Sequence, residues 1–200
     1  VAFWTILAPS REELLDLIDK HQDRSAFDRA VTLAWTQAQV QLRHLGMKPD
    51  EAADFQRLAG HIIYADPRLR PSSETIQRGC GSQAGLWPHG ISGDIPIVLI
   101  RIDDVEDMEA VRQLLRAHEY WRMKQLAVDL VILNERTSSY VQDLQIAIET
   151  SVRSSQSRPR LGEELTRGTV FMLRSDLMSS EARALLSSVA RVVLSARCGT

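Results

Sequence analysis

The 200-residue chain contains few cysteines, and this scarcity limits the kinds of site it can build. Cys80 and Cys198 are the only two, and they lie far apart without a CxxC motif or a paired histidine spacing. The sequence therefore predicts neither a disulfide framework nor a zinc site, and it fits a reducing compartment.

Long apolar runs and an excess of one charge are also missing. No run approaches the ~18–20 residues that span a bilayer, and residues 1–7 lack the basic leader and cleavage site of a signal peptide. The 24 basic and 26 acidic residues give a net charge of −2. Because neither sign dominates, we expect no nucleic-acid partner and no direct membrane contact from this segment.

What remains is ordinary for a globular chain, with 44% hydrophobic and 25% charged residues. Its length fits one large domain or two small ones. The sequence begins with Val1 rather than Met, and we expect it to be a fragment of a longer protein.

The first part of the sequence predicts one strand followed by helices. Residues 1–7 are apolar and precede Pro9, which suits the last strand of a sheet. Ser10 and Glu13 form a capping box that begins a helix ending near His21. Apolar residues at three- and four-residue intervals predict two longer helices and a few turns before Arg78; they are Phe27, Ala30, Val31, Ala34, Ala38, Leu42 and Leu45, then Ala52, Phe55, Leu58, Ala59, Ile62 and Ile63.

The second part alternates between strands and helices. Strands are predicted at Ile95–Ile102, Val128–Leu133 and Thr169–Leu173. Ser180 is expected to cap a last helix that extends through Val193 and Ala196. This alternation implies parallel βαβ units with right-handed crossovers. The predicted fold is mixed α/β and helix-rich, with a terminal strand at 1–8, a helical arm at 9–78 and a small α/β module with a parallel sheet at 79–200.

A glycine-rich loop joins the two parts, since five of the ten glycines lie between Gly79 and Gly93. The run 79–84 matches the dinucleotide fingerprint G-x-G-x-x-A, but that motif must follow a strand and open a helix. The run 90–93 resembles a nucleophile elbow whose second glycine comes one residue too early. Both patterns favour a connecting loop over cofactor binding or hydrolase chemistry, and we expect no cofactor and no metal.

The same loop carries a candidate sugar site. The face of Trp87 could stack on a sugar ring while His89 and Asp94 grip hydroxyl groups, an arrangement typical of pockets with a few polar groups. Alternatively, Trp87 fills the junction between the two parts of the chain and Asp94 caps loop amides. The sequence favours this second interpretation.

Asn134 and Glu135 follow the second predicted strand. Ligands of open α/β sheets bind at the carboxyl ends of strands, which makes these residues candidates for substrate binding. A turn with Asn134 in left-handed geometry fits equally well. The acidic run 103–107 begins a helix, where carboxylates stabilise the helix dipole, so it does not indicate a catalytic cluster.

Several long blocks of the sequence resemble one known family. The blocks, in order, are Ala34–Gln37, Phe55–Ala59, Leu86–Ile102, Ala117–Arg122 and Val128–Glu135. They look like cyclic β-1,2-glucan synthase, and more narrowly like its C-terminal portion, which is related to cellobiose phosphorylase. The resemblance covers nearly the whole chain.

The resemblance implies a position for this segment within a larger enzyme, and it assigns no active site to the segment. Proteins of this family are large inner-membrane enzymes that polymerise glucose from UDP-glucose and close the product into a ring. Their phosphorylase-like portion controls chain length and combines β-sandwich modules with an (α/α)₆ barrel. Residues 1–8 would then be the final strand of a β-sandwich, and the segment would lie on the cytoplasmic side of the membrane. The glucosyltransferase motif and the phosphorylase general acid have no counterpart here, so no catalytic residue is assigned.

Two functions follow from these observations. The first is a non-catalytic structural segment between domains, with the neighbouring β-sandwich and barrel modules as partners and possible contact with β-glucan. The alternative is an autonomous α/β domain that binds a carbohydrate or a nucleotide at the loop 79–94 or near Asn134. A third hypothesis is a glucan-binding surface that Trp87 contributes to the active site of the longer enzyme.

Overall fold

The structure, a computed structural model, describes residues 5–136, 143–156 and 168–196. The chain divides into two compact units between Pro49 and Asp50. The sequence predicts a later boundary, between residues 78 and 79. The two differ because the helices at 50–78 pack on the α/β unit.

The described residues of the first unit form two helices, α1 (Arg11–His21) and α2 (Arg24–Leu45), which contact each other. Ser10 Oγ accepts a hydrogen bond from the Glu13 backbone N–H at 3.2 Å, as the capping pattern predicts. Gly46 ends α2 in a left-handed conformation with φ +62°. Of the strand expected at 1–8, residues 5–8 form no strand, and the remainder lies outside the described residues.

The second unit begins with α3 (Pro49–Tyr64), which packs on the long helix α5 (Met108–Met123). The indole Nε1 of Trp121 donates to the Phe55 carbonyl at 2.9 Å, and Arg116 pairs with Glu51 at 2.7 Å. Three short helices connect α3 to the sheet: η1 (Pro67–Leu69), α4 (Ser73–Arg78) and η2 (Gln83–His89).

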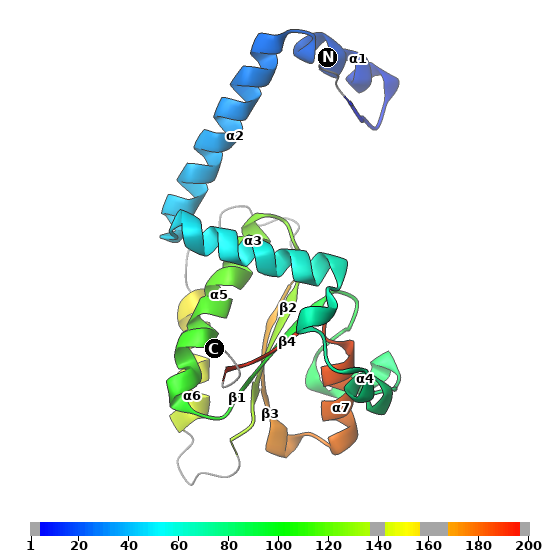
Figure 1. The fold of residues 1–200 in the computed structure, drawn as a ribbon, viewed down its shortest axis with the longest axis vertical. Coiled ribbons are helices and arrows are strands. Elements are labelled where there is room, and N and C mark those ends of the chain that lie inside the picture. The colour runs from blue at the N-terminus through cyan, green and yellow to red at the C-terminus, as the bar shows by residue number, and fades with distance from the viewer. Residues whose placement is uncertain (1–4, 137–142, 157–167, 197–200) are drawn as a thin grey trace. The chain divides into compact units, whose positions relative to one another are not determined.

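A four-stranded parallel sheet forms the centre of this unit, with strand order β3-β2-β1-β4. The strands are β1 (Ile97–Ile102), β2 (Asp129–Asn134), β3 (Val170–Arg174) and β4 (Val192–Ser195). The remaining helices are η3 (Val105–Asp107), α6 (Asp143–Gln156), η4 (Ser175–Leu177) and α7 (Ser180–Val189). Helices α5 and α6 cover one face of the sheet, and α4 and α7 lie on the other (Figure 1).

The strand order explains this layering. The chain moves in one direction from β1 through α5, β2 and α6 to β3, then returns through α7 to the opposite side of β1. With right-handed crossovers, the reversal places α7 on the opposite face from α5 and α6. The prediction of a helix-rich, mixed α/β fold with a small parallel sheet is confirmed.

The prediction for the last helix is wrong in its extent. Helix α7 ends at Val189 because Ala190 adopts an extended conformation, and Val193 lies in β4 instead. The Arg191 backbone N–H donates to the Ile97 carbonyl at 2.8 Å, which starts the pairing of β4 with β1. The N-cap is Ser179 rather than Ser180, since the Ser179 side chain accepts from the Ala182 N–H.

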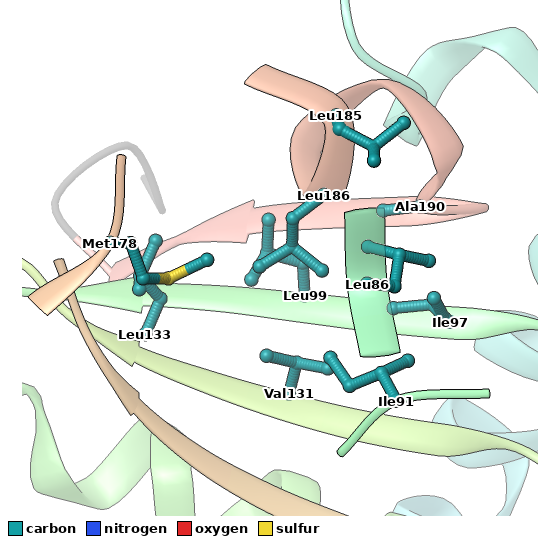
Figure 2. Close-up of a cluster of buried hydrophobic side chains, with 10 residues drawn as sticks. All are labelled: Leu86, Ile91, Ile97, Leu99, Val131, Leu133, Met178, Leu185, Leu186 and Ala190. Carbon is teal, nitrogen blue, oxygen red and sulfur yellow. The ribbon is translucent and has the colours of Figure 1, made fainter. Parts of the chain in front are cut away.

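The central strands β1 and β2 are buried at all but one position, as expected for parallel strands covered on two sides, and the outer strands β3 and β4 are mostly half-buried. Figure 2 shows the cluster on the α7 face, where Leu86 and Ile91 from the loop region pack with strand and helix residues. The cluster consists of Leu86, Ile91, Ile97, Leu99, Val131, Leu133, Met178, Leu185, Leu186 and Ala190. The connecting loop therefore supplies core residues and is held in place by them.

Candidate functional site

The glycine-rich loop leaves α4 where that helix packs closely against α7. Ser188 Oγ donates to the Gly79 carbonyl at 2.9 Å, and a Cβ on Gly79 would lie 2.3 Å from the Ala184 carbonyl oxygen. Gly79 thus permits close helix contact. The fingerprint-like run 79–84 lies between α4 and η2 rather than between a strand and a helix. The sequence analysis predicted this, because the run follows a helical segment and precedes a strand.

Asp94 braces the far end of this loop. Its Oδ1 accepts from Gln83 Nε2 at 3.0 Å, and the same amide donates to the Ser92 carbonyl at 2.7 Å. The Asp94 backbone N–H donates to Ser92 Oγ at 3.2 Å. These contacts support the interpretation of Asp94 as a loop-stabilising residue.

A second carboxyl group lies buried near Asp94. Burial raises the pKa of Asp129, and the Asp94 charge raises it further, while a hydrogen bond from the Thr169 N–H opposes both effects. That bond joins Thr169 N to Asp129 Oδ1 at 2.9 Å. Asp129 therefore ties the start of β2 to the residue preceding β3, a structural role.

Trp87 does not fill a junction, because 62% of it is exposed. That interpretation of Trp87 is wrong. The physical reason is that Leu86, which is 2% exposed, turns into the core in its place. Trp87 therefore presents an aromatic surface to the exterior of this chain.

His89 lines a pocket of about 400 Å³ beside the edge strand β3. Five of the eight lining residues are apolar, and the full set is Pro88, His89, Gln145, Met172, Leu173, Arg174, Leu177 and Met178. The volume falls within the range of ~300–1,000 Å³ found for small-ligand sites. Of the predicted sugar-binding residues of the loop, His89 belongs to this lining, and Trp87 and Asp94 do not.

Two of the three polar side chains of the pocket, those of Arg174 and Gln145, are already engaged. Arg174 makes two hydrogen bonds with the Asp176 carboxylate, at 3.1 and 2.6 Å, and Asp176 has a pKa below its usual range because of this pairing. Gln145 accepts from Asn134 Nδ2 at 3.3 Å and donates to Glu149 at 3.0 Å. The pocket thus offers apolar walls and little uncompensated charge.

Asn134 and Glu135 lie at the carboxyl edge of the sheet, as predicted. Asn134 Oδ1 accepts from the Arg136 backbone N–H at 3.0 Å, and Glu135 Oε1 accepts from Arg101 Nε at 2.8 Å. Asn134 is the last residue of β2, so the expected left-handed conformation is wrong and its side chain shapes the turn instead. Both residues stabilise the strand ends, and neither lines the pocket.

Sequence reasoning missed the pocket itself. Met172, Arg174 and Leu177 come together only because β3 is an edge strand and η4 turns back beside it. The sequence contains an apolar strand followed by a polar turn, a pattern that many strands share. No signal in it would have distinguished a pocket wall from an ordinary strand end.

Within the described ranges, no group of three or more His, Cys, Asp or Glu side chains could hold a metal ion. Cys80 is exposed, and Cys198 lies outside those ranges. Among the described helices, none combines the length and apolar character needed to cross a membrane.

Comparison with known proteins relates this chain to part of a longer protein. No family model matches the chain. The chain is 42% identical, over all 200 of its residues, to the cyclic beta-(1,2)-glucan synthase NdvB of Rhizobium meliloti. The chain is thus similar to one segment of a cyclic β-1,2-glucan synthase.

The predicted resemblance is confirmed by this identity, which extends from the helices of the first unit to the end of the α/β unit. The chain spans 7% of the length of that synthase. The loop, the pocket and the carboxyl edge described above therefore belong to a region that matches a small part of a much longer protein.

Proposed function

We propose that this chain is a non-catalytic segment between domains of a cyclic β-1,2-glucan synthase. The proposal is supported by the 42% identity to a small part of such an enzyme. One observation carries it: an apolar stripe along α2 that the described residues of the first unit leave largely uncovered.

The stripe follows the helical period along 22 residues. Val31 and Trp35 on this face are 50% and 66% exposed. The backbone of a helix alone contributes little stability in water. A helix is therefore normally stabilised by burial of its apolar face against a partner. Monomeric proteins rarely expose contiguous apolar surface, and such surface marks an interaction site.

In this proposal, the neighbouring β-sandwich and (α/α)₆ barrel modules of the longer enzyme cover the α2 stripe. The phosphorylase-like character of those modules, the anchoring of the enzyme in the inner membrane and the cytoplasmic placement of this segment are parts of the same proposal. The identity to a glucan synthase supports them.

A chimera tests the proposal. The matching segment of the Rhizobium meliloti synthase is replaced by this chain, and the production of cyclic β-1,2-glucan is measured together with the amount of enzyme in the cell. Trp35→Asp should reduce activity or accumulation at least tenfold, because a charge would be buried at the interface. Thr36→Asp is the matched control on the polar face of α2 and should change neither quantity.

Equal behaviour of the Trp35 and Thr36 variants would refute the docking role. The non-catalytic part of the proposal has its own test in the same chimera. Asn134→Ala and Glu135→Gln should retain glucan synthesis at a normal enzyme level, and a specific loss of turnover would contradict it.

Glucan contact through the loop 79–94 is a second candidate, favoured by the exposure of Trp87 next to a pocket that His89 lines. Titration of β-1,2-glucan oligosaccharides should then change the tryptophan fluorescence of the chain in a saturable way. The change should disappear in Trp87→Ala. A flat titration would remove this candidate and leave the first proposal intact.

A further inference from the structure

The open edge of β3 is a second uncovered feature, separate from α2. Strand β3 pairs with β2 on one side, and no other described strand lies on its other side. Within β3, the residues Val170, Phe171, Met172 and Leu173 are apolar, and the one charge, on Arg174, is paired with Asp176. Edge strands are usually protected by lysine, proline, bulges or short length, and β3 has no lysine or proline.

The register identifies which backbone groups face outward. The Leu130 N–H donates to the Thr169 carbonyl at 2.9 Å, and Leu130 is opposite Val170 in the ladder. In a parallel pair, alternate residues direct both their N–H and C=O groups to the same neighbour. Residues 169, 171 and 173 therefore bond β2, and Val170, Met172 and Arg174 direct their backbone groups away from it.

The pocket lies along this same edge. Three consecutive residues of β3, Met172 to Arg174, form part of its wall, together with Gln145 from α6 on one face of the sheet. Pro88 and His89 from η2 contribute the wall from the other face. A cavity that takes its walls from both faces and from successive strand residues runs beside the strand's open side.

The chemistry of the pocket favours an apolar side chain over a sugar or an anion. The Arg174 charge is compensated by Asp176, and Gln145 is bonded to Asn134 and Glu149. In the described part of the chain, His89 is the one polar lining residue that forms no hydrogen bond or ion pair. A sugar needs several polar partners at once, whereas peptide recognition at a sheet edge needs open backbone groups and one apolar pocket.

We infer that the β3 edge binds an extended polypeptide segment as a fifth strand, with an apolar side chain of that segment in the pocket. The segment comes from the part of the longer synthase outside these 200 residues, since the matching relative is many times longer than the chain. For the source of the strand, the inference rests on the proposed function. It does not depend on the α2 stripe.

The test uses the 200-residue chain and overlapping short peptides that cover the rest of the Rhizobium meliloti synthase sequence. Peptides that share one stretch should bind, and binding should slow hydrogen exchange at the Met172 and Arg174 amides, which face outward. Amides of residues 171 and 173, which already bond β2, should change little. This measurement needs no variant.

A pair of variants separates backbone pairing from side-chain packing. Met172→Pro removes an outward N–H and leaves the β2 ladder intact, as proline is tolerated on edge strands. It should weaken peptide binding about tenfold or more, through the lost hydrogen bond and the steric block. Met172→Ala is the matched control, which truncates the side chain, keeps the N–H and should bind more tightly than the proline variant.

Three results would overturn the inference: no peptide binds, bound peptide leaves the Met172 and Arg174 amides unprotected, or a β-1,2-glucan oligosaccharide binds the pocket and the peptides do not. A dimer of the chain that Met172→Pro abolishes would also overturn it, because a second copy would then occupy the edge. Trp35→Asp should leave peptide binding unchanged. Failure of the α2 proposal is therefore distinguishable from failure of this one.

Discussion

Two helices of this chain have similar apolar periodicity and opposite environments. Helix α5 buries Val111, Leu115 and Trp121 to 0%, 4% and 1% exposure, between the sheet and α3. Helix α2 leaves Val31 and Trp35 at 50% and 66% exposure. The periodic pattern identifies the face of a helix that will be buried, but it does not say whether this chain supplies the cover.

The largest contrast should appear between the two tryptophans. Trp121→Ala should lower the free energy of unfolding by about 3–5 kcal/mol, because it removes a buried indole and its hydrogen bond to the Phe55 carbonyl. Trp35→Ala should cost roughly 0.5 kcal/mol or less in this chain. Urea unfolding followed by circular dichroism measures both, and similar losses would mean that α2 is covered here as well.

The pH dependence of stability should depend on a histidine of the covered helix. Burial lowers the pKa of His118 to about 4, while its ring Nε2 lies 2.9 Å from the Val128 carbonyl oxygen. Since the unfolded state has the ordinary value of 6.5, it binds the proton first as pH falls. Stability from this residue should be complete above pH 6.5 and decline by up to about 3 kcal/mol as the pH approaches 4.

The control for this prediction is His118→Gln, which keeps a donor for the Val128 carbonyl and cannot titrate. The stability of the wild-type chain relative to this variant should fall between pH 6.5 and 4. Parallel curves for the two proteins over that interval would contradict the buried, neutral state of His118.

Two glycines, Gly46 in the first unit and Gly79 in the second, should lose stability on substitution for different reasons. Gly79→Ala should cost about 1–3 kcal/mol, because the new Cβ would meet the Ala184 carbonyl oxygen and Ser188 Cβ at 2.3 and 2.4 Å. Gly46→Ala should cost about 1 kcal/mol from backbone strain alone, since its φ is +62° and no atom lies within 4 Å of the new Cβ.

A second substitution at each position checks the cause. Leucine in place of alanine should worsen the loss at position 79 and leave the loss at position 46 nearly unchanged, because only the former is limited by neighbouring atoms. Thermal unfolding of the four variants gives the comparison. A further loss with leucine at position 46 would show hidden packing around the end of α2.

The sequence predicted most of this fold because local patterns decided it. Ser10 and Gly46 mark the helix ends where capping chemistry places them. The three predicted strands coincide with β1, β2 and β3 within about two residues. The fourth strand was missed because Val193 and Ala196 continue the three- and four-residue spacing of α7, and only pairing with β1 makes that run extended.

The candidate site was harder to predict because local patterns do not show which distant segments come together. Trp87 is exposed and Leu86 buried, although either could have turned inward from the loop. His89 reaches a pocket whose other walls come from β3, η4 and α6, which are distant in the sequence. Of the three loop residues predicted to bind a sugar, Trp87, His89 and Asp94, the fold therefore places only His89 in the pocket.

The position of β4 beside β1 has a consequence for how the chain folds. Strand β1 is central in the sheet, yet one of its two neighbours, β4, follows the other three described strands in the sequence. Strands β1, β2 and β3 can associate while the chain is still leaving the ribosome, but one side of β1 stays unpaired until residues 192–195 emerge. Long-range parallel pairing of this kind is slow and exposes strand edges in the interval. Residues 192–195 thus determine when β1 is paired on both sides.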